Sequence, residues 1–417
     1  MAGKILIVDE MAVNRIVLRV KLGRAHYVTT AVADGASALA ALAAERPALV
    51  LLDIDLPDMS GLDVLATIRS TAALRDLPVL VVTAGIARAT RLAALAAGAD
   101  DILTKPVDED LLLARIRSLF EAPEAAVYLV ATGTVANALA IATLTPPWGA
   151  VFCHRHAHIA EDECGAPEFY TAGAKLVLVD GAHGRMTPET LGAALETTGA
   201  SGVHGVQRGM LSLTNVTEAG TLYTPAEIAA LTALAKAHNL PCHLDGARFA
   251  NALVALGCTP AEMTWKAGID AVSFGGTKNG LLGVEAVIFF DPAKAWEFEL
   301  RRKRAGHLFS KHRFLSAQML AYLTDDLWLT LATRANAMGA RLASGIETIT
   351  GAALTHPTRA NMVFANWPAG GHARAQAAGA AYYDLRPAPD GRETARLVAS
   401  WSTTEADVDD FIAALRG

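Results

Sequence analysis

The chain has 417 residues, which is enough for two to three domains. Hydrophobic residues make up 52% and charged residues 19%, and the mean hydropathy of +0.30 excludes a disordered chain and favours large buried parallel sheets. The net charge of −6 provides no basic patch, so nucleic acid is excluded as an expected partner.

The cysteines and the N-terminus indicate a cytoplasmic protein. None of the four cysteines forms a Cys-x-x-Cys pair, and the first residues show no signal-peptide pattern. We therefore expect free, mostly buried thiols, with Cys153 and Cys164 acting as small buried hydrophobic residues.

The uncharged segment 125–152 could be mistaken for a membrane span. Small and polar residues and a pair of prolines interrupt it, namely Thr132, Gly133, Thr134, Asn137, Pro146 and Pro147. A buried strand followed by a buried helix explains the same composition. We therefore expect no membrane partner.

Residues 1–120 alternate short apolar runs with segments that carry Ala, Leu and Arg at helical spacing. Five runs have the pattern of strands, at residues 5–8, 28–32, 49–52, 79–82 and 102–103. A β–α repeat of this length predicts an α/β fold of the flavodoxin-like type, in which helices cover both faces of a doubly wound parallel sheet.

Polar residues stand at the ends of these strands. Asp9 and Glu10 end the first strand, Asp53 the third, Thr83 the fourth and Lys105 the fifth. Because parallel strands open onto one crevice, Asp9, Glu10 and Asp53 could bind Mg²⁺ through oxygen ligands. Asp53 would then attack a phosphoryl group, and Thr83 and Lys105 would contact the new phosphate oxygens. The alternative is a set of solvated charges.

This pattern resembles the receiver domain of two-component response regulators over residues 1–120. The Thr-Lys-Pro run at 104–106 is a strong marker of that family, whereas Glu10 departs from the more common second aspartate. The resemblance implies a phosphoprotein in which Asp53 is the phosphoacceptor and Thr83 and Lys105 form the switch. It also implies a histidine kinase as partner.

A second α/β pattern begins near residue 125. Its strand candidates are residues 127–130, 150–152, 176–179, 242–244, 271–274 and 287–290. From about residue 298 the sequence changes to an Arg- and Lys-rich helix and then to a smaller α+β tail. We therefore predict three domains, at residues 1–120, 121–297 and 298–417, with no flexible linker after residue 120.

Lys278 and Asp245 each follow an apolar strand, in Gly-Thr-Lys-Asn-Gly and His-Leu-Asp-Gly-Ala-Arg. A lysine can hold pyridoxal phosphate as a Schiff base, and an acid beside the pyridine nitrogen keeps the ring protonated as an electron sink. Upstream, an apolar helix starts within the segment that contains Thr132, Gly133, Thr134 and Asn137. Backbone N–H groups at such a helix start can bind the phosphate.

These motifs resemble those of the low-specificity L-threonine aldolases, which have an aspartate-aminotransferase-like fold with a large and a small domain. The resemblance runs from about residue 125 to residue 417, and further matches lie at residues 146–165, 211–215, 243–251, 301–307 and 396–401. It implies that His158 stacks on the cofactor ring, Asp245 pairs with its nitrogen and Lys278 bonds to it. Arg248 and Arg396 would hold the substrate carboxylate, for which a planar guanidinium is suited.

Other interpretations stay open for several of these residues. His154, His156 and His158 alternate along the chain, and could share one strand face that binds zinc. His158 alone could be a satisfied core histidine, and Arg248 could be a structural ion-pair partner. Residues 301–304 are expected to form a solvated helix face near the cofactor.

The sequence differs from the L-threonine aldolases that it resembles in its N-terminal part. An L-threonine aldolase has an N-terminal segment that supplies a serine contact to the substrate carboxylate and a loop toward the neighbouring subunit. Here the receiver-like residues stand in its place, so we expect looser orientation of the substrate. We also expect the remaining lyase part to self-associate as a homo-oligomer.

Three functional hypotheses follow. The first is a pyridoxal-phosphate-dependent aldehyde-lyase that cleaves the small amino acids L-threonine and L-allo-threonine to glycine and acetaldehyde, regulated by phosphorylation of Asp53. The second is a phospho-signalling protein whose aldolase-like part is inactive or serves only for interaction. The third is another β-eliminating lyase of the same fold, because the cofactor motifs are shared across reactions.

Overall fold

The computed structural model describes residues 4–84, 88–121 and 124–416. The chain divides into two compact units, 1–122 and 123–417, and each has its own fold. Ala122 and Pro123, where no flexible linker is expected, lie outside the described residues.

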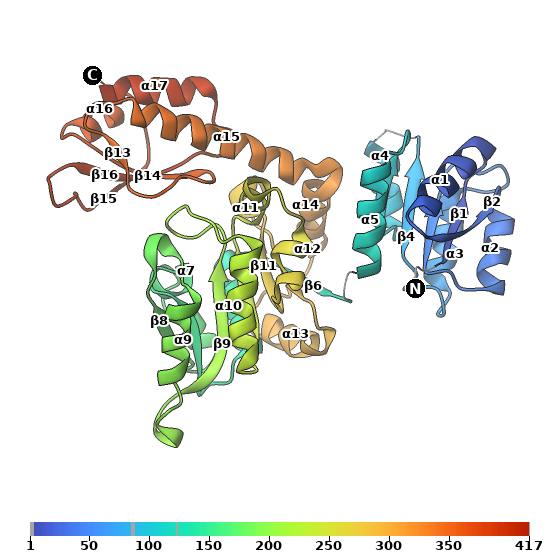
Figure 1. Cartoon of the computed structure of the whole chain (residues 1–417), viewed down its shortest axis with the longest axis horizontal. Helices are drawn as coiled ribbons and strands as arrows, with labels where there is room; N and C mark the ends of the chain where they lie inside the picture. The colour runs from blue at the N-terminus through green and yellow to red at the C-terminus, as the bar shows by residue number, and fades with distance from the viewer. Residues whose placement is uncertain (1–3, 85–87, 122–123, 417) are drawn as a thin grey trace. The chain divides into compact units, whose positions relative to one another are not determined.

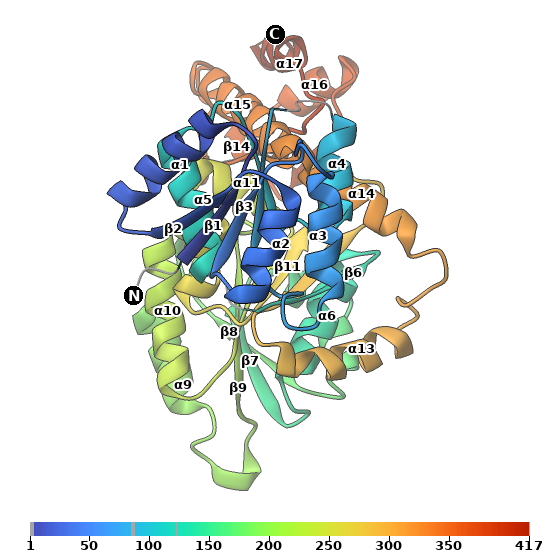
Figure 2. The ribbon, with the colours of Figure 1, turned by 90° about the vertical axis from the view of Figure 1, so that its right-hand side faces the viewer.

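The first unit is a parallel sheet in the order β2-β1-β3-β4-β5. Its strands are β1 (Lys4–Val8), β2 (Val28–Val32), β3 (Leu49–Leu52), β4 (Val79–Thr83) and β5 (Asp101–Thr104). One face is covered by α1 (Ala12–Arg24) and α5 (Glu109–Glu121), and the other by α2 (Gly35–Ala44), α3 (Gly61–Ser70) and α4 (Arg88–Ala96), as Figure 2 shows. Alternate strand residues enter two apolar cores, with Ile5 and Ile7 on the α1 side and Leu6 and Val8 on the α2 side. The predicted doubly wound fold is confirmed.

The second unit contains a sheet in the order β6-β12-β11-β10-β9-β7-β8. Its strands are β6 (Ala126–Val130), β7 (Gly149–His154), β8 (Lys175–Val179), β9 (Gln207–Thr214), β10 (Cys242–Gly246), β11 (Ala271–Gly275) and β12 (Glu285–Phe289). All six predicted strands are present. The apolar pattern missed β9 because the polar residues Gln207, Arg208 and Ser212 interrupt its apolar run.

This sheet is mixed rather than purely parallel. Strand β12 runs antiparallel to both of its neighbours, β11 and β6. The connection from Gly275 to Glu285 is too short for the crossover that a parallel strand would need. The composition indicated parallel sheets, and it could not reveal this one reversed strand.

Helices cover both faces of the large sheet (Figures 1 and 2). On one face α9 (Pro188–Thr197) and α10 (Pro225–Ala237) pack in a core with Phe152. On the other, α6 (Gly133–Leu144) and α13 (Ala295–Arg304) pack in a core with Val151. Helix α6 is buried from Val135 to Leu144, which accounts for the long uncharged segment. No helix among the described residues is long and apolar enough to cross a membrane.

A smaller antiparallel sheet follows in the order β13-β14-β16-β15. Its strands are β13 (Ala353–Leu354), β14 (Met362–Trp367), β15 (Tyr383–Leu385) and β16 (Glu393–Val398), and α15 (Leu327–Glu347), α16 (Gly371–Ala377) and α17 (Glu405–Arg416) lie along it (Figure 1). Helix α15 joins two cores, since Trp328 packs with the large sheet and Ile346 with the small one. The core of the small sheet therefore begins within α15, further along the chain than the predicted boundary at residue 298.

The remaining α-helices are α7 (His158–Glu161), α8 (Ala166–Tyr170), α11 (Phe249–Leu256), α12 (Pro260–Met263) and α14 (Arg313–Leu323). Two expectations about single residues are wrong. Cys164 is exposed, because it lies in the turn between α7 and α8. Arg302 is buried instead of solvated, and its guanidinium packs over Tyr128 and donates to the carbonyl of Leu129 at 3.3 Å.

Candidate active site

In the first unit, three charged side chains meet at the C-terminal edge of the sheet. Asp9 and Asp53 are buried, and Lys105 Nζ lies 2.7 Å from Asp9 Oδ2 and also bonds Asp53 Oδ2. Burial raises the pKa of Asp53, although Lys105 opposes that effect. Burial alone would lower the pKa of Lys105, but the hydrogen bonds that its ammonium donates to Asp53 and Asp9 outweigh this effect and raise that pKa. The site is thus a carboxylate pair bridged by one lysine.

Thr83 is also buried, at the end of β4, whereas Glu10 is exposed beyond β1. Among the described residues, no group of three His, Cys, Asp or Glu side chains is arranged to hold a metal ion. The structure therefore brings together Asp9, Asp53 and Lys105 and leaves Glu10 outside this cluster.

In the second unit, Lys278 and Asp245 lie at the ends of neighbouring parallel strands. Asp245 is in β10, and Lys278 lies in the short helical turn Thr277–Asn279 that follows β11. Among the described residues, the Lys278 ammonium has no hydrogen-bond or ion-pair partner. Its side chain is exposed, yet enough protein surrounds it that desolvation, followed by the charge of Arg248, lowers its pKa. A lysine with a lowered pKa is a better nucleophile at neutral pH.

The turn that carries Lys278 is fixed by a buried glutamate that the sequence analysis did not identify. Glu285 lies opposite Gly275 in the antiparallel β11–β12 pair, and its Oε2 accepts from the Gly276 N–H at 2.6 Å. Burial raises the pKa of Glu285. Because β12 runs antiparallel to β11, the Glu285 carboxylate lies beside the turn that carries Lys278. An apolar strand pattern alone could not have revealed this contact.

Asp245 belongs to a buried hydrogen-bonded chain. Asn137 Nδ2, within α6, donates to Asp245 Oδ2 and to Glu163 Oε1, both at 2.9 Å. Glu163 Oε1 in turn lies 2.9 Å from His158 Nδ1. The other Asp245 oxygen accepts from the Ala247 N–H at 3.0 Å. Asn137 was predicted beside the phosphate, but the structure directs its side chain toward Asp245, because it lies a full turn inside the helix.

The start of α6 retains the predicted anion-binding geometry. The Thr132 hydroxyl caps the helix by accepting from the Val135 N–H at 3.3 Å. Among the described residues, the N–H groups of Gly133 and Thr134 have no hydrogen-bond acceptor. Apart from its chain neighbours and its own helix, no protein atom lies within 4 Å of the position that a Cβ on Gly133 would take. Two backbone donors at the positive end of the helix dipole are therefore left without a protein acceptor.

Two arginines complete the group. Arg248 precedes α11, Arg396 lies in β16, and the Nε atoms of both are buried without a hydrogen-bond partner among the described residues. The guanidinium of Arg396 stacks over Tyr383 at 4.3 Å. Burial lowers the pKa of Arg248, while Glu218 opposes this effect and Arg396 adds to it. An anion between the two would satisfy donors that the protein leaves unpaired.

The three alternating histidines do not share a strand face. His154 ends β7, His156 lies in the turn, and His158 begins α7. His154 Nδ1 accepts from the His156 N–H at 3.1 Å, so its Nε2 donates to the Gly181 carbonyl at 3.0 Å. The zinc interpretation is wrong, because the strand ends after His154 and each imidazole has a different partner.

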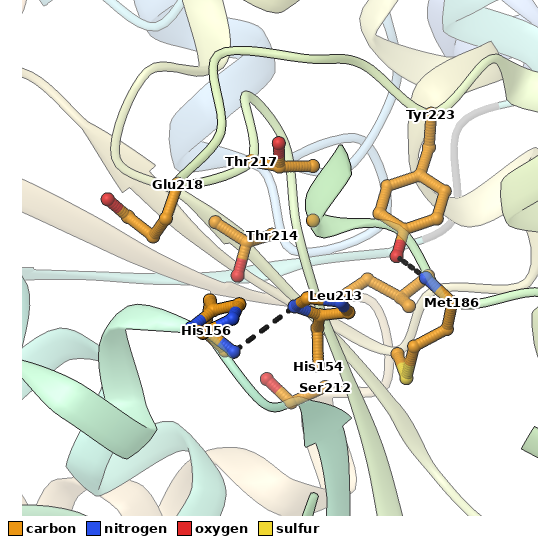
Figure 3. A pocket seen from close by; sticks show the side chains of 11 residues that line it. His154, His156, Met186, Ser212, Leu213, Thr214, Thr217, Glu218 and Tyr223 are labelled. Carbon is orange, nitrogen blue, oxygen red and sulfur yellow. Dashed lines mark hydrogen bonds between the residues drawn. The ribbon is translucent and has the colours of Figure 1, made fainter. Parts of the chain in front are cut away.

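His154 and His156 instead line a pocket beside the site (Figure 3). Its opposite side is formed by the segment after β9, with Thr217, Glu218 and Tyr223. The Glu218 carboxylate is close enough to influence the pKa of both Lys278 and Arg248. The sequence analysis did not select Glu218, since nothing in its local sequence marks it.

A bridged carboxylate pair in a doubly wound domain, followed by a strand-end lysine and acid beside a helix start, defines a signalling receiver joined to a pyridoxal-phosphate enzyme. Residues 82–367 match the sequence model of the beta-eliminating lyases, and the chain belongs to that family of pyridoxal-phosphate-dependent lyases. Residues 5–117 match the response regulator receiver domain.

Individual relatives agree with both assignments. The chain is 40% identical to a low-specificity L-threonine aldolase of a Pseudomonas species, over 72% of this chain and 85% of the relative. A threonine aldolase structure from Leishmania major aligns with a TM-score of 0.66 and 29% identity, over 70% of this chain and 84% of that chain. The response regulator PleD of Caulobacter vibrioides is 39% identical over 28% of this chain and 26% of its own length, so only about a quarter of that relative is matched.

The two family matches overlap over residues 82–117. The match to the lyase model thus begins before the second compact unit, which starts at residue 123, close to the expected start near residue 125. The described residues of this overlap belong to the receiver fold, from the end of β4 through α4 and β5 into α5.

Proposed function

We propose that the second unit is a carbon–carbon lyase that cleaves L-threonine or L-allo-threonine to glycine and acetaldehyde. The observation that carries this proposal is the unpaired, pKa-lowered Lys278 beside Asp245, with the unpaired guanidinium nitrogens of Arg248 and Arg396 near them. Similarity to aldolases over most of their length supports the choice of substrate.

The residues present fit pyridoxal phosphate. Lys278 would bond to it covalently, Asp245 would pair with the ring nitrogen, and the N–H groups of Gly133 and Thr134 would hold the phosphate. When bound, the cofactor supplies an electron sink for the carbanion left by Cα–Cβ cleavage. Asp245 accepts hydrogen bonds from Asn137 and Ala247, which hold its carboxylate in place for pairing with the ring nitrogen.

The chain's own side chains would orient the substrate. Arg248 and Arg396 would grip the carboxylate, which fixes the direction of the Cα–Cβ bond. His158 Nδ1 is engaged by Glu163, so only Nε2 of that ring remains to face the cofactor or move a proton from the β-hydroxyl. Another pyridoxal-phosphate lyase reaction could use the same framework, and a product assay separates it from aldol cleavage.

The decisive variant is Asp245→Asn. It should leave the lysine-bound cofactor visible by absorption while slowing acetaldehyde release by orders of magnitude, because a ring nitrogen without its acid is a poorer electron sink. The control is Asp270→Asn. This variant makes the same change in a carboxylate that lies just before β11, at the opposite end of the strand from Lys278. Normal turnover of Asp245→Asn would exclude the proposed role.

We also propose a second function, that Asp53 accepts a phosphoryl group from a histidine kinase and thereby regulates the lyase. The bridged arrangement of Asp53, Lys105 and Asp9 supports it, since a lysine at the acceptor can bind the new phosphate. Asp9 and Asp53 would hold the Mg²⁺, since both carboxylates are buried and lie at the same lysine. Threonine cleavage with and without a small phosphodonor tests the regulation, and equal rates on fully phosphorylated protein would exclude it.

A further inference from the structure

We propose that Glu163 is a positioning residue whose buried carboxylate fixes the ring of His158 and is tied through Asn137 to Asp245. Neither the receiver function nor the aldolase similarity assigns a role to Glu163. The inference rests on the proposed function only in naming the cofactor as the group on which His158 and Asp245 act.

The contacts form one continuous path between the two acid–base residues. A single oxygen, Glu163 Oε1, accepts from Asn137 Nδ2 at 2.9 Å and lies 2.9 Å from His158 Nδ1. The same Asn137 nitrogen reaches Asp245 Oδ2 at 2.9 Å. Because the amide nitrogen donates both its protons to carboxylate oxygens, a change in charge at either acid alters its bond to the other.

The local fold builds this path from residues that are far apart in sequence. Helix α7 has only one turn, and after it Cys164 (φ 52°) and Gly165 (φ 71°) adopt left-handed conformations that reverse the chain. The reversal buries the preceding residue, Glu163, whose side chain is fully inaccessible to solvent. Asn137 meets it from the buried face of α6.

Burial makes the charge of Glu163 effective. Glu163 Oε2 is buried without a hydrogen-bond partner among the described residues, and burial raises the pKa of this carboxyl, opposed by its bonds to His158 and Asn137. The bond to Glu163 raises the pKa of His158 more than burial lowers it. Of the other charged groups that act on His158, Lys278 lowers its pKa and Asp245 raises it. The titrations of the histidine and the glutamate are therefore coupled.

The chain contains its own control pair. His156 Nδ1 lies 2.8 Å from Glu161 Oε1, with the same spacing of five residues as His158 and Glu163. This outer pair is exposed, with both side chains about half accessible to solvent. Solvent screens an exposed pair, so its charge has little influence. If the two glutamates affect the pKa of their histidines differently, the cause is therefore burial and not the spacing along the chain.

The experiment compares Glu163→Gln with Glu161→Gln in the full chain, using ring-labelled histidine NMR and a His158→Gln variant to assign the signal. Glutamine keeps an oxygen acceptor in place and removes only the charge. The pKa of His158 should fall by about one unit or more in Glu163→Gln and stay unchanged in Glu161→Gln. No fall in Glu163→Gln, or an equal fall in both variants, would overturn the proposal.

A second readout uses the cofactor-loaded protein. The absorption of the lysine-bound cofactor should titrate differently with pH in Glu163→Gln than in the parent, and Glu163→Asp should recover part of the parent behaviour. If Glu163→Gln does not fold, the parent chain alone decides, because the His158 pKa must lie above the ordinary value of about 6.5. Since the histidine titration requires no substrate, failure to cleave threonine would sink the proposed function and leave this inference standing.

Discussion

Replacing Arg396 by lysine should weaken substrate binding while leaving cofactor binding intact. The change keeps the positive charge but removes the planar fork and the stacking on Tyr383 at 4.3 Å. A hydrogen bond to a charged group contributes about 1.5–3 kcal/mol. At about 1.4 kcal/mol per factor of ten, kcat/KM for L-threonine should fall roughly 10- to 150-fold, mostly through a higher KM.

The assay is steady-state acetaldehyde release, with Arg392→Lys as the control. Arg392 lies directly before β16, the strand that carries Arg396. Its guanidinium is paired with Asp390 at 2.8 Å, so this position should tolerate the change to lysine. Threoninol, which lacks the carboxylate, is the second control, and its slow cleavage should be equal in parent and Arg396→Lys. If the variant lost the same factor on threoninol as on threonine, Arg396 would not be the carboxylate ligand.

Four further outcomes are expected. Lys278→Ala should abolish borohydride-reducible attachment of the cofactor without unfolding the chain; attachment that persists would assign another lysine. With Mg²⁺ and a small phosphodonor, intact-mass measurement should show one phosphoryl group on the parent and none on Asp53→Asn, and an unmodified parent would argue against a working receiver. Burial lowers the pKa of His243 to about 4. As the pH falls, His243 is therefore protonated in the unfolded chain before it is protonated in the folded one. The contribution of His243 to the free energy of unfolding should be fully present above pH 6.5, and the free energy should decrease by about 3 kcal/mol toward pH 4. Urea unfolding followed by tryptophan fluorescence checks this, because all six tryptophans follow residue 147, and His243→Gln should flatten the slope. Finally, with Phe169 77% and Trp296 70% exposed, light scattering should detect an oligomer, and a monomer would contradict the expected self-association.

Strand-end residues could be predicted from the sequence because a strand fixes where its last side chain lies. Asp53, Asp245 and Lys278 were found in this way, since each follows an apolar run. The rule fails where a side chain is placed by chain reversal or by an irregular segment. Glu163 becomes buried through two left-handed residues, and Glu285 through an antiparallel strand, neither of which leaves a periodic signal. The repeated His-x4-Glu spacing was the one available clue to Glu163.

Predicting the partner of a side chain was harder than predicting its place. Asn137 lies in the predicted segment, but its amide serves Asp245 and not the helix start. Glu10 lies at the predicted strand end, but its side chain is exposed, while Lys105 joins the two buried aspartates. In both cases the sequence defined the neighbourhood, and the choice of contact depended on burial, which only the packed structure determines.

The two sites differ in how their charges are balanced, and this difference bears on what each can do. In the receiver, Lys105 already neutralises part of the Asp9 and Asp53 charge, so an incoming phosphoryl group must redistribute contacts that exist. In the lyase, Lys278 lacks a partner and the Nε atoms of Arg248 and Arg396 are unpaired, while Asp245 is held by Asn137. Buried donors are seldom left unpaired in a folded protein unless a ligand completes them. The receiver site is thus suited to switch between two sets of contacts, whereas the lyase site is suited to hold an anionic cofactor and an anionic substrate together.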